Sequence, residues 1–296
     1  MKRRRLKIIF FLAVVMAFAS CHSPENKGSG AFFTWEDSYH RNVKLDTAPQ
    51  RIVSISPAIT EVVFLVGAQE KLVGISDFCK YPEETEKIDK VGGMHNINFE
   101  KLLSLHPDVV LIGSMISEKD VAAIEKMGIP VICIVEESSL EGMSELIEVV
   151  GRIAQCEDKA REEALKWSKK IAELKSNAPR PEERKCVYYV VGFGDAGDFT
   201  APKNTHIQEI IELAGARNAG DTLTGWNISR EYLFQIDPDI IIVRKEDRDA
   251  FVSRHPYTLL NAVKNERVYP IESGWIDVVS LRNMDAVDYL KRICSE

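Results

Sequence analysis

Two pairs of similar segments, with one member of each pair in either half of the chain, most constrain how the chain can fold. Residues 61–68 resemble residues 209–216, and residues 100–111 resemble residues 231–242. In the second pair a Glu stands seven residues before a Pro, where a helix must end, and an apolar run follows. Both pairs occur in the same order. This favours two equivalent halves over the recurrence of strand and helix patterns that any α/β chain shows.

Short apolar runs alternate with helical patterns from residue 51 onward. Continuous runs of strand length are typical of parallel strands covered on both faces, and they occupy residues 51–55, 109–112, 131–135, 187–191 and 240–243. Apolar residues at helical spacing occupy residues 60–66, 99–105, 118–127 and 206–214. Gly67, Gly128 and Gly215 stand at helix ends, where glycine is common. The sequence therefore predicts an α/β fold.

A long helix is predicted between the halves, over residues 158–177. Its apolar residues recur three or four positions apart, at Ala160, Ala164, Trp167, Ile171 and Leu174. Prolines at positions 179 and 181 end the pattern, and a capping box of Ser138 with Glu141 starts an earlier helix. A helix of about 20 residues spans roughly 30 Å, the width of a small domain. We expect a stiff connection between two lobes.

The first residues have the order of a secretory signal, a basic run at residues 1–7 followed by an apolar run at residues 8–19. The apolar run is too short to cross a bilayer, which needs roughly 20 residues in a helix. Residues 18–21 resemble a lipoprotein box, with Phe18 where Leu is usual, and predict lipidation of Cys21. The alternative is an ordinary signal that is cleaved near a cysteine.

Charge and residue spacing exclude several classes of function. Removal of residues 1–20 takes away five positive charges, so the formal net charge changes from −7 to −12. An acidic surface disfavours binding to nucleic acid. The histidines form no zinc motif and no GxSxG elbow is present, so we expect no metal site, no cofactor and no enzymatic activity. Two other classes of function stay open as less favoured alternatives, an extracytoplasmic enzyme and a structural lipoprotein.

The chain also contains a set of ordered motifs. They lie at residues 51–61, 73–76, 81–82, 100–111, 226–231 and 274–282. In this order they resemble the helix-backbone class (class III) of periplasmic solute-binding proteins of metal-chelate ABC importers, and most of all its cobalamin-binding members. The resemblance covers residues 51–293. It implies an α/β protein with two Rossmann-like lobes, a long rigid backbone helix between them, and a ligand cleft between the lobes.

The resemblance and the signal divide the chain into five parts. These are a signal peptide of lipoprotein type at residues 1–20, a lipid-anchored tether and N-terminal extension at 21–48, an N-terminal lobe at 49–155, a backbone helix at 156–178 and a C-terminal lobe at 179–296. The expected protein is a monomeric lipoprotein on the extracytoplasmic or periplasmic side of a membrane. It binds the bilayer through Cys21 and delivers its ligand to the transmembrane subunits of an ABC importer.

In the family that the chain resembles, one surface glutamate on each lobe contacts basic residues of the transporter. The matching residues are Glu100 and Glu231. Two carboxylates at a fixed separation would orient a rigid receptor on a two-fold symmetric partner. The alternative is that each glutamate only stabilises the N-terminus of its own helix, an effect of about 0.3 to 1 kcal/mol.

The resemblance also implies which residues line the ligand cleft and which ligands are preferred. The candidates are Phe78, Met94, His95, Phe193, Trp226, Trp275 and Arg282. Aromatic walls suit a large planar ligand, so cobalamin or a related corrinoid comes first, although Met94 replaces an expected Trp. A ferric siderophore comes second, and Gly93 in place of a tyrosine disfavours haem. The alternative for each Trp is a place in the core, and for Arg282 a simple salt bridge.

Residues 192–197 satisfy the dinucleotide fingerprint GxGxxG after an apolar run. The fingerprint requires the glycines to open a helix whose N-terminus binds pyrophosphate. Residues 198–203, which include a Pro, favour a loop instead. The sequence therefore disfavours a dinucleotide site, and the resemblance places this loop at the mouth of the cleft.

Overall fold

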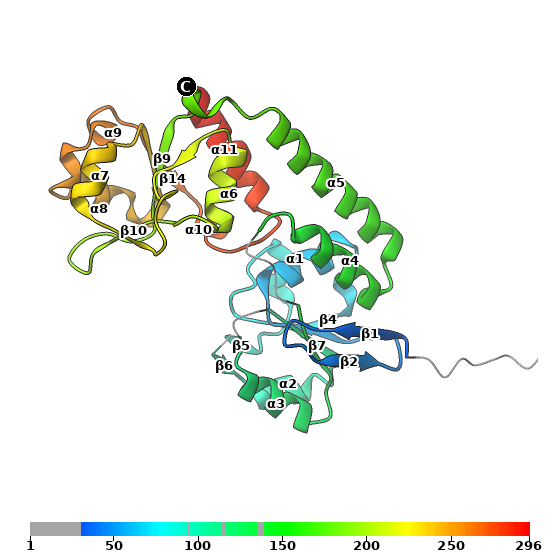
Figure 1. Cartoon of the computed structure of the whole chain (residues 1–296). Coiled ribbons are helices and arrows are strands. Elements are labelled where there is room, and N and C mark those ends of the chain that lie inside the picture. Colours follow the sequence, from blue (N-terminus) through cyan, green and yellow to red (C-terminus); the bar gives the residue numbers. More distant parts are fainter. Residues whose placement is uncertain (1–30, 94, 114–115, 135–138) are drawn as a thin grey trace, which may run out of the picture. The chain divides into compact units, whose positions relative to one another are not determined.

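Two four-stranded parallel sheets with one topology form the framework of the protein (Figure 1). The computed structural model describes residues 31–93, 95–113, 116–134 and 139–296. The first sheet has the order β4-β3-β7-β8 and the second the order β11-β9-β13-β14. The bounds are β3 Ile52–Ser54, β4 Leu72–Ile75, β7 Val109–Ile112, β8 Val131–Cys133, β9 Cys186–Val190, β11 Arg217–Asn218, β13 Ile240–Arg244 and β14 Val268–Ile271. In each sheet the first strand along the chain lies between the second and the third. The predicted α/β fold with two equivalent halves is confirmed.

The four helices predicted within the halves begin within three residues of their predicted starts, whereas the helix predicted from the capping box of Ser138 and Glu141 begins only at Met143, after Gly142. The bounds of the helices are α1 Pro57–Leu65, α2 Phe99–Ser104, α3 Glu118–Lys126, α4 Met143–Ala154, α5 Glu157–Ser176, α6 His206–Leu213, α7 Arg230–Ile236, α8 Arg248–Ser253, α9 Asn261–Lys264, α10 Ser273–Ile276 and α11 Asn283–Ser295. Short 3₁₀ turns occur at Gln69–Lys71, Glu83–Lys87, Pro181–Glu183, Lys245–Asp247 and Tyr257–Leu259. Gly67, Gly128 and Gly215 have φ near +80°, as expected of the residue that ends a helix. None of the described helices is long and apolar enough to cross a membrane.

Alternate residues of the strands pack on opposite faces of each sheet. In β7, Val109 and Leu111 enter one buried cluster, while Val110 and Ile112 enter another. The first cluster, here named the shared core, also contains the inward residues of β9 and β13 and buried residues of α1, α4, α5, α6 and α11. The outer face of each sheet has a cluster of its own. One continuous apolar core therefore joins the two halves.

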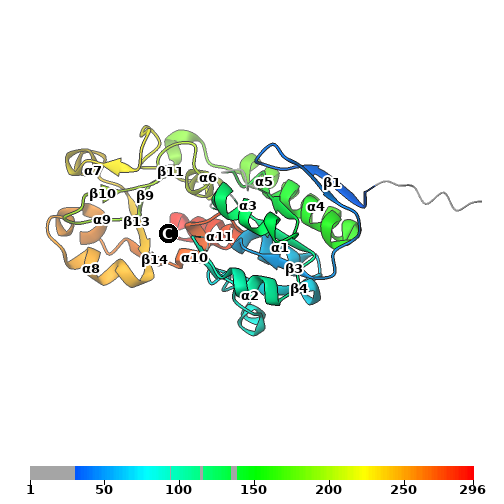
Figure 2. The same ribbon diagram turned by 90° about the horizontal axis from the view of Figure 1, so that it is seen from below.

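Helix α5 connects the halves and lies beside α4 (Figures 1 and 2). The predicted apolar residues of α5 are the buried ones, and the prediction of residues 158–177 is correct within one residue. Trp167 also donates a hydrogen bond from Nε1 to the carbonyl of Leu140, at 2.6 Å. A side chain on Gly151 of α4 would overlap Ala160 of α5, so glycine permits the close approach. The helix is therefore packed into the shared core along one face.

An N-terminal hairpin covers the edge of the first sheet. It consists of β1 Phe33–Glu36 and β2 Asn42–Leu45, within the predicted N-terminal extension. Ser38 donates its backbone N–H to the carbonyl of Cys133 in β8, at 3.1 Å. The buried carboxylate of Asp37 accepts the N–H of Cys133 at 3.2 Å and forms an ion pair with Arg41. The hairpin thus occupies hydrogen-bonding groups that an edge strand leaves unpaired.

Two further short pairings occur in the described part of the chain. Strand β5 Gly92–Gly93 pairs with β6 Asn96–Ile97, and β10 Asp198–Phe199 pairs with β12 Asn227–Ile228. Both β6 and β12 lead into a helix, α2 and α7 respectively. The signal peptide, Cys21, Met94 and Ser138 of the predicted capping box lie outside the described residues.

Replacement of Asp37 by Ala should destabilise the protein. The substitution leaves the Arg41 guanidinium and several backbone N–H groups without their buried acceptor. We expect the free energy of unfolding, measured in urea, to fall by about 3 kcal/mol. Asp46→Ala, which removes an exposed carboxylate in the ion pair with Lys44, is the control and should have an effect below about 1 kcal/mol. Equal effects of the two substitutions would contradict the proposed sealing of the edge.

Candidate functional site

Four of the predicted ligand residues follow the carboxyl ends of parallel strands. Phe78 comes after β4, Phe193 after β9, and Trp275 and Arg282 after β14. Open parallel sheets bind ligands at this edge, where the loops leave the strands. The strand topology of each half thus places these residues where a ligand site is expected.

The loop that follows β4, residues 76–82, carries an exposed aromatic ring next to a hairpin. Phe78 is 55% exposed. A Cβ on Gly93 would lie 3.1 Å from Cε2 of Phe78, so this ring rests on the backbone of the β5–β6 hairpin. The turn of the hairpin contains His95, which is exposed, and Met94, which lies outside the described residues. The structure therefore brings Phe78 close to the hairpin that contains His95.

Arg282 contacts both halves of the protein. Its Nε donates a hydrogen bond to Oε1 of Glu61 in α1, at 2.9 Å. Its guanidinium carbon lies 5.1 Å from the ring centre of Tyr81, within cation–π range. Tyr81 belongs to the same loop as Phe78 and is 48% exposed. A Cβ on Gly274 would overlap this guanidinium group, so glycine leaves the room that Arg282 needs.

Burial sets the charge state of Glu61. Its carboxyl group is 1% exposed and accepts the backbone N–H of Leu281 at Oε2, at 3.2 Å. Desolvation raises the pKa of Glu61 to about 7, although Arg282 and the N–H of Leu281 act in the opposite direction. Asp285 adds to the increase. At neutral pH a partly protonated carboxyl group therefore lies beside Arg282.

Two predicted aromatic residues are half-buried rather than exposed. The ring of Phe193 makes an edge-to-face contact with Phe251, with centres 5.2 Å apart, and Trp275 makes such a contact with Tyr289 at 6.2 Å. Trp226, by contrast, is 44% exposed and directly precedes β12. Phe78 and Trp226 are thus the predicted aromatic ligand residues that are exposed, whereas Phe193 and Trp275 pack on separate aromatic partners.

Buried Asp198 holds the glycine-rich loop at residues 192–197. Its Oδ2 accepts a hydrogen bond from Nε of Arg230, at 2.8 Å, and the same guanidinium donates to the carbonyl of Gly194, at 2.6 Å. The loop leads into β10, and the next helix begins only at His206. The glycines therefore open no helix, in agreement with the prediction that this loop is not a dinucleotide site.

The predicted docking residues, Glu100 and Glu231, occupy equivalent positions. Each is the second residue of its helix and is exposed. Asn98 caps α2 and Ser229 caps α7, each by accepting a backbone N–H in the first turn. The same arrangement of short strand, capping residue and glutamate thus recurs in the two halves.

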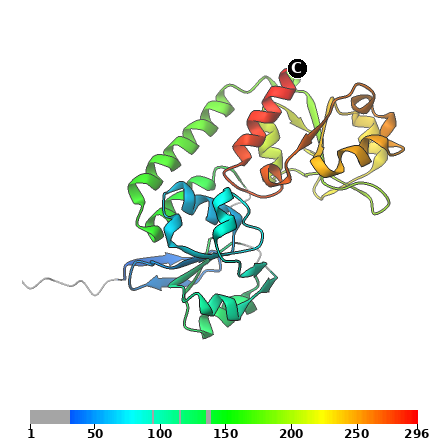
Figure 3. The ribbon, with the colours of Figure 1, turned by 180° about the vertical axis from the view of Figure 1, so that it is seen from behind.

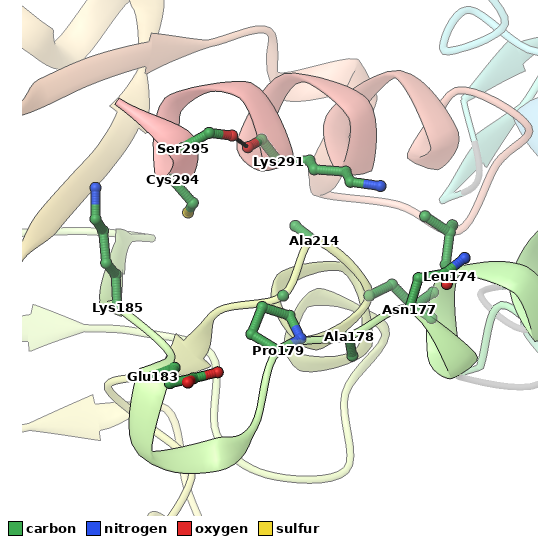
Figure 4. Close-up of a pocket in the computed structure, with 12 residues that line it drawn as sticks. Leu174, Asn177, Ala178, Pro179, Glu183, Lys185, Ala214, Lys291, Cys294 and Ser295 are labelled. Atoms are coloured by element: carbon green, nitrogen blue, oxygen red, sulfur yellow. Dashed lines mark hydrogen bonds between the residues drawn. The ribbon is translucent and has the colours of Figure 1, made fainter.

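A pocket of about 260 Å³ lies away from these residues, among the carboxyl ends of α5, α6 and α11 (Figure 4). Pro179, Lys185, Lys291 and Cys294 belong to its lining, which contains none of the predicted ligand residues that the structure describes. Burial raises the pKa of the Cys294 thiol to about 11, so the thiol is protonated at neutral pH. The pocket does not form part of the candidate ligand site.

Comparison with known proteins identifies the family. Residues 52–273 match the periplasmic binding proteins. The chain belongs to this family. It is 30% identical to the ABC transporter substrate-binding lipoprotein YvrC of Bacillus subtilis over 304 residues, which covers 98% of this chain and 96% of YvrC. The vitamin B12-binding protein of Pectobacterium atrosepticum is 26% identical over 66% of this chain and 71% of its own length.

The solved structures show the same architecture. The periplasmic haem-binding protein HutB of Vibrio cholerae superposes with a TM-score of 0.75 at 22% identity, over 82% of this chain and 98% of HutB. At this identity the likeness shows the fold alone. The predicted family and the two-lobed α/β fold are confirmed. Since periplasmic binding proteins bind solutes without chemical conversion, the protein is a substrate-binding protein and not an enzyme.

Sequence reasoning named Arg282 and missed its two partners. Tyr81 lies in a motif that carried the resemblance, and its place two residues before the 3₁₀ turn at Glu83–Lys87 gave no sign of exposure. Glu61 belongs to one of the repeated segments, and its place among apolar residues was the only sign that its carboxylate is buried. A buried charge requires a partner, but the partner is distant in the sequence.

The raised pKa of Glu61 predicts a pH-dependent difference between the wild type and Glu61→Gln. Between pH about 4.5 and 7 the unfolded chain releases the Glu61 proton while the folded chain retains it, so rising pH destabilises the wild type relative to Glu61→Gln. The difference in the free energy of unfolding between the wild type and Glu61→Gln should change by at most about 3 kcal/mol over this range. It should level off above pH 7. Urea unfolding over a pH series measures it. A difference between the wild type and Glu61→Gln that does not vary with pH would contradict the assignment.

Proposed function

We propose that the protein captures a metal chelate, cobalamin or a related corrinoid, and delivers it to the membrane subunits of an ABC importer. The observation that carries this proposal is the exposed pair Phe78 and Tyr81 in one loop, with Arg282 of the other half over the Tyr81 ring. Large planar ligands bind well to aromatic faces that have a few polar groups beside them. The relatives named for vitamin B12 binding support the same choice.

Arg282 is suited to orient a ligand rather than to supply net positive charge. A guanidinium group has five N–H donors, and the hydrogen bond to Glu61 uses the one on Nε. Amide oxygens at the rim of a corrinoid would accept hydrogen bonds from the others. The carboxyl group of Glu61 offsets the charge of Arg282 when it is ionised, which favours a ligand of low charge over an anionic one. A ferric siderophore remains the second candidate.

Delivery requires two further features, an anchor and a docking surface. A lipid on Cys21 would hold the protein at the membrane, and the name of the Bacillus subtilis relative as a lipoprotein supports this. Glu100 and Glu231 would contact basic residues of the importer. Their equivalent positions on α2 and α7 suit a partner with two-fold symmetry, because each half presents the same carboxylate in the same local structure.

Titration of the mature protein with cobalamin tests the ligand. We expect a saturable change in absorbance together with binding heat at micromolar concentrations. Phe78→Ala should weaken binding by about 10- to 100-fold, the effect of losing roughly 1.5 to 3 kcal/mol of aromatic contact. Leu165→Ala on α5 is the control, since Leu165 is 65% exposed and lies outside the loops of the site. Saturable binding of a ferric siderophore or haem in place of cobalamin would replace the corrinoid assignment.

Charge reversal tests the docking role. Glu100→Lys together with Glu231→Lys should abolish cobalamin uptake in cells that contain the importer, with the dissociation constant for cobalamin unchanged. Glu118→Lys with Asp249→Lys is the matched control, because these acidic residues also lie in the exposed first turns of one helix in each half. Equal loss of uptake in both double variants would show that the effect comes from helix N-termini and not from docking.

A further inference from the structure

The repeated segments place a glutamate in the first helix of each half. The function proposed above uses Glu61 only to offset the charge of Arg282, and it does not use Glu209. Glu61 lies in α1 and Glu209 in α6. Oε2 of Glu61 accepts the backbone N–H of Leu281, at 3.2 Å. Oε2 of Glu209 accepts the backbone N–H of Leu140, at 2.6 Å. Each glutamate therefore binds a backbone N–H group that belongs to the opposite half of the chain.

The two acceptor sites are equivalent. Leu140 lies three residues before α4, and Leu281 lies two residues before α11. Helices α4 and α11 each follow the last strand of their sheet, β8 and β14. The contacts are thus reciprocal, since the first helix of each half holds the segment that leads into the last helix of the other half. In Figures 1 and 3 this segment before α11 lies beside α1.

Both contacts border the shared core. Glu61 is 1% exposed, and burial raises the pKa values of both Glu61 and Glu209. Leu140 is held at both backbone groups, because its carbonyl accepts the hydrogen bond from Trp167 of α5. The hydrogen bond of Glu61 is costly to break, since its buried carboxyl group would lose a partner away from water, whereas Glu209 is half-buried.

We propose that Glu61 and Glu209 are positioning residues, a reciprocal pair of inter-lobe cross-links that fix the separation of the two lobes. The cross-link at Glu61 also sets the place of Arg282 and so of the ligand site. Only this last consequence rests on the proposed function. The separation of the lobes does not depend on which ligand binds.

The chemistry of the two contacts predicts different responses to substitution. Glu209 serves as an acceptor for one backbone N–H, so the amide oxygen of Glu209→Gln should replace it, whereas Glu209→Ala should break the cross-link. Glu61 faces the guanidinium of Arg282 as well as an N–H group, all of them donors. The amide of Glu61→Gln brings a further donor to this site, so we expect Glu61→Gln to weaken its cross-link.

The separation of the lobes is measured with the whole ligand-free mature protein. Probes attached through an azide-bearing amino acid at exposed positions 126 and 246, one in each half, avoid the native cysteines. Pulsed dipolar spectroscopy then gives the distribution of distances between them. We expect a distribution that is broader than in the wild type for Glu61→Gln and Glu209→Ala, broadest for the two combined, and unchanged for Glu209→Gln. Glu148→Ala, an exposed position on α4, controls for the loss of a carboxylate.

Hydrogen exchange keeps the proposal testable if a variant is unstable. Faster exchange of the Leu140 amide in Glu209→Ala but not in Glu209→Gln would support the cross-link. The proposal is overturned if folded Glu209→Ala and Glu61→Gln have the distance distribution of the wild type. Broader distance distributions in the variants of a wild-type protein that does not bind cobalamin would support the cross-links and count against the ligand assignment instead, so the two failures are distinguishable.

Discussion

The shared core is the constraint on which the rest of the structure depends. In a pair of separately folded lobes each sheet would complete its own core, and the connecting helix would set their arrangement alone. Here the inward faces of both sheets, together with α1, α4, α5, α6 and α11, enter one buried cluster. Separation of the lobes would expose this apolar surface to water, which is unfavourable in proportion to its area. Ligand capture therefore takes place on a framework that resists large hinge motions.

The equivalence of the halves arises from a local device that the chain uses twice. His106 and Asp237 adopt positive φ directly before a proline, and each of these prolines is followed by an aspartate. Asp108 then accepts the N–H of Arg51, and Asp239 accepts the N–H of Cys186, at the start of the neighbouring strand. A helix end, a turn and a strand start are thus fixed by three consecutive residues. The repeat of residues 100–111 and 231–242 was visible in the sequence because these three residues are adjacent in each half. It predicts the topology because each copy joins the end of a helix to the start of a strand.

The sequence predicted elements whose signals are local, and it could not predict contacts between distant residues. The apolar runs, the glycines at helix ends and the spacing of buried residues in α5 each reflect one element and its solvent exposure. The contact of Glu61 with Arg282 joins residues 221 positions apart and requires both lobes to be in place. Nor could side-chain direction be predicted for Phe193 and Trp275, since an aromatic residue after a strand suits a core or a cleft equally. In the structure Phe193 packs against Phe251 and Trp275 against Tyr289.

Buried polar groups in the shared core explain how an apolar interface acquires a defined geometry. Apolar contacts tolerate small shifts of one surface over another, because the hydrophobic effect has no direction. A carboxylate that must meet particular N–H groups permits far fewer arrangements, although its desolvation lowers the stability it adds. Glu61 meets the N–H of Leu281 and the guanidinium of Arg282, which itself lies over Tyr81. The same side chains that align the lobes therefore lead directly to the exposed aromatic loop, so the geometry of the interface and that of the candidate site are set by one network.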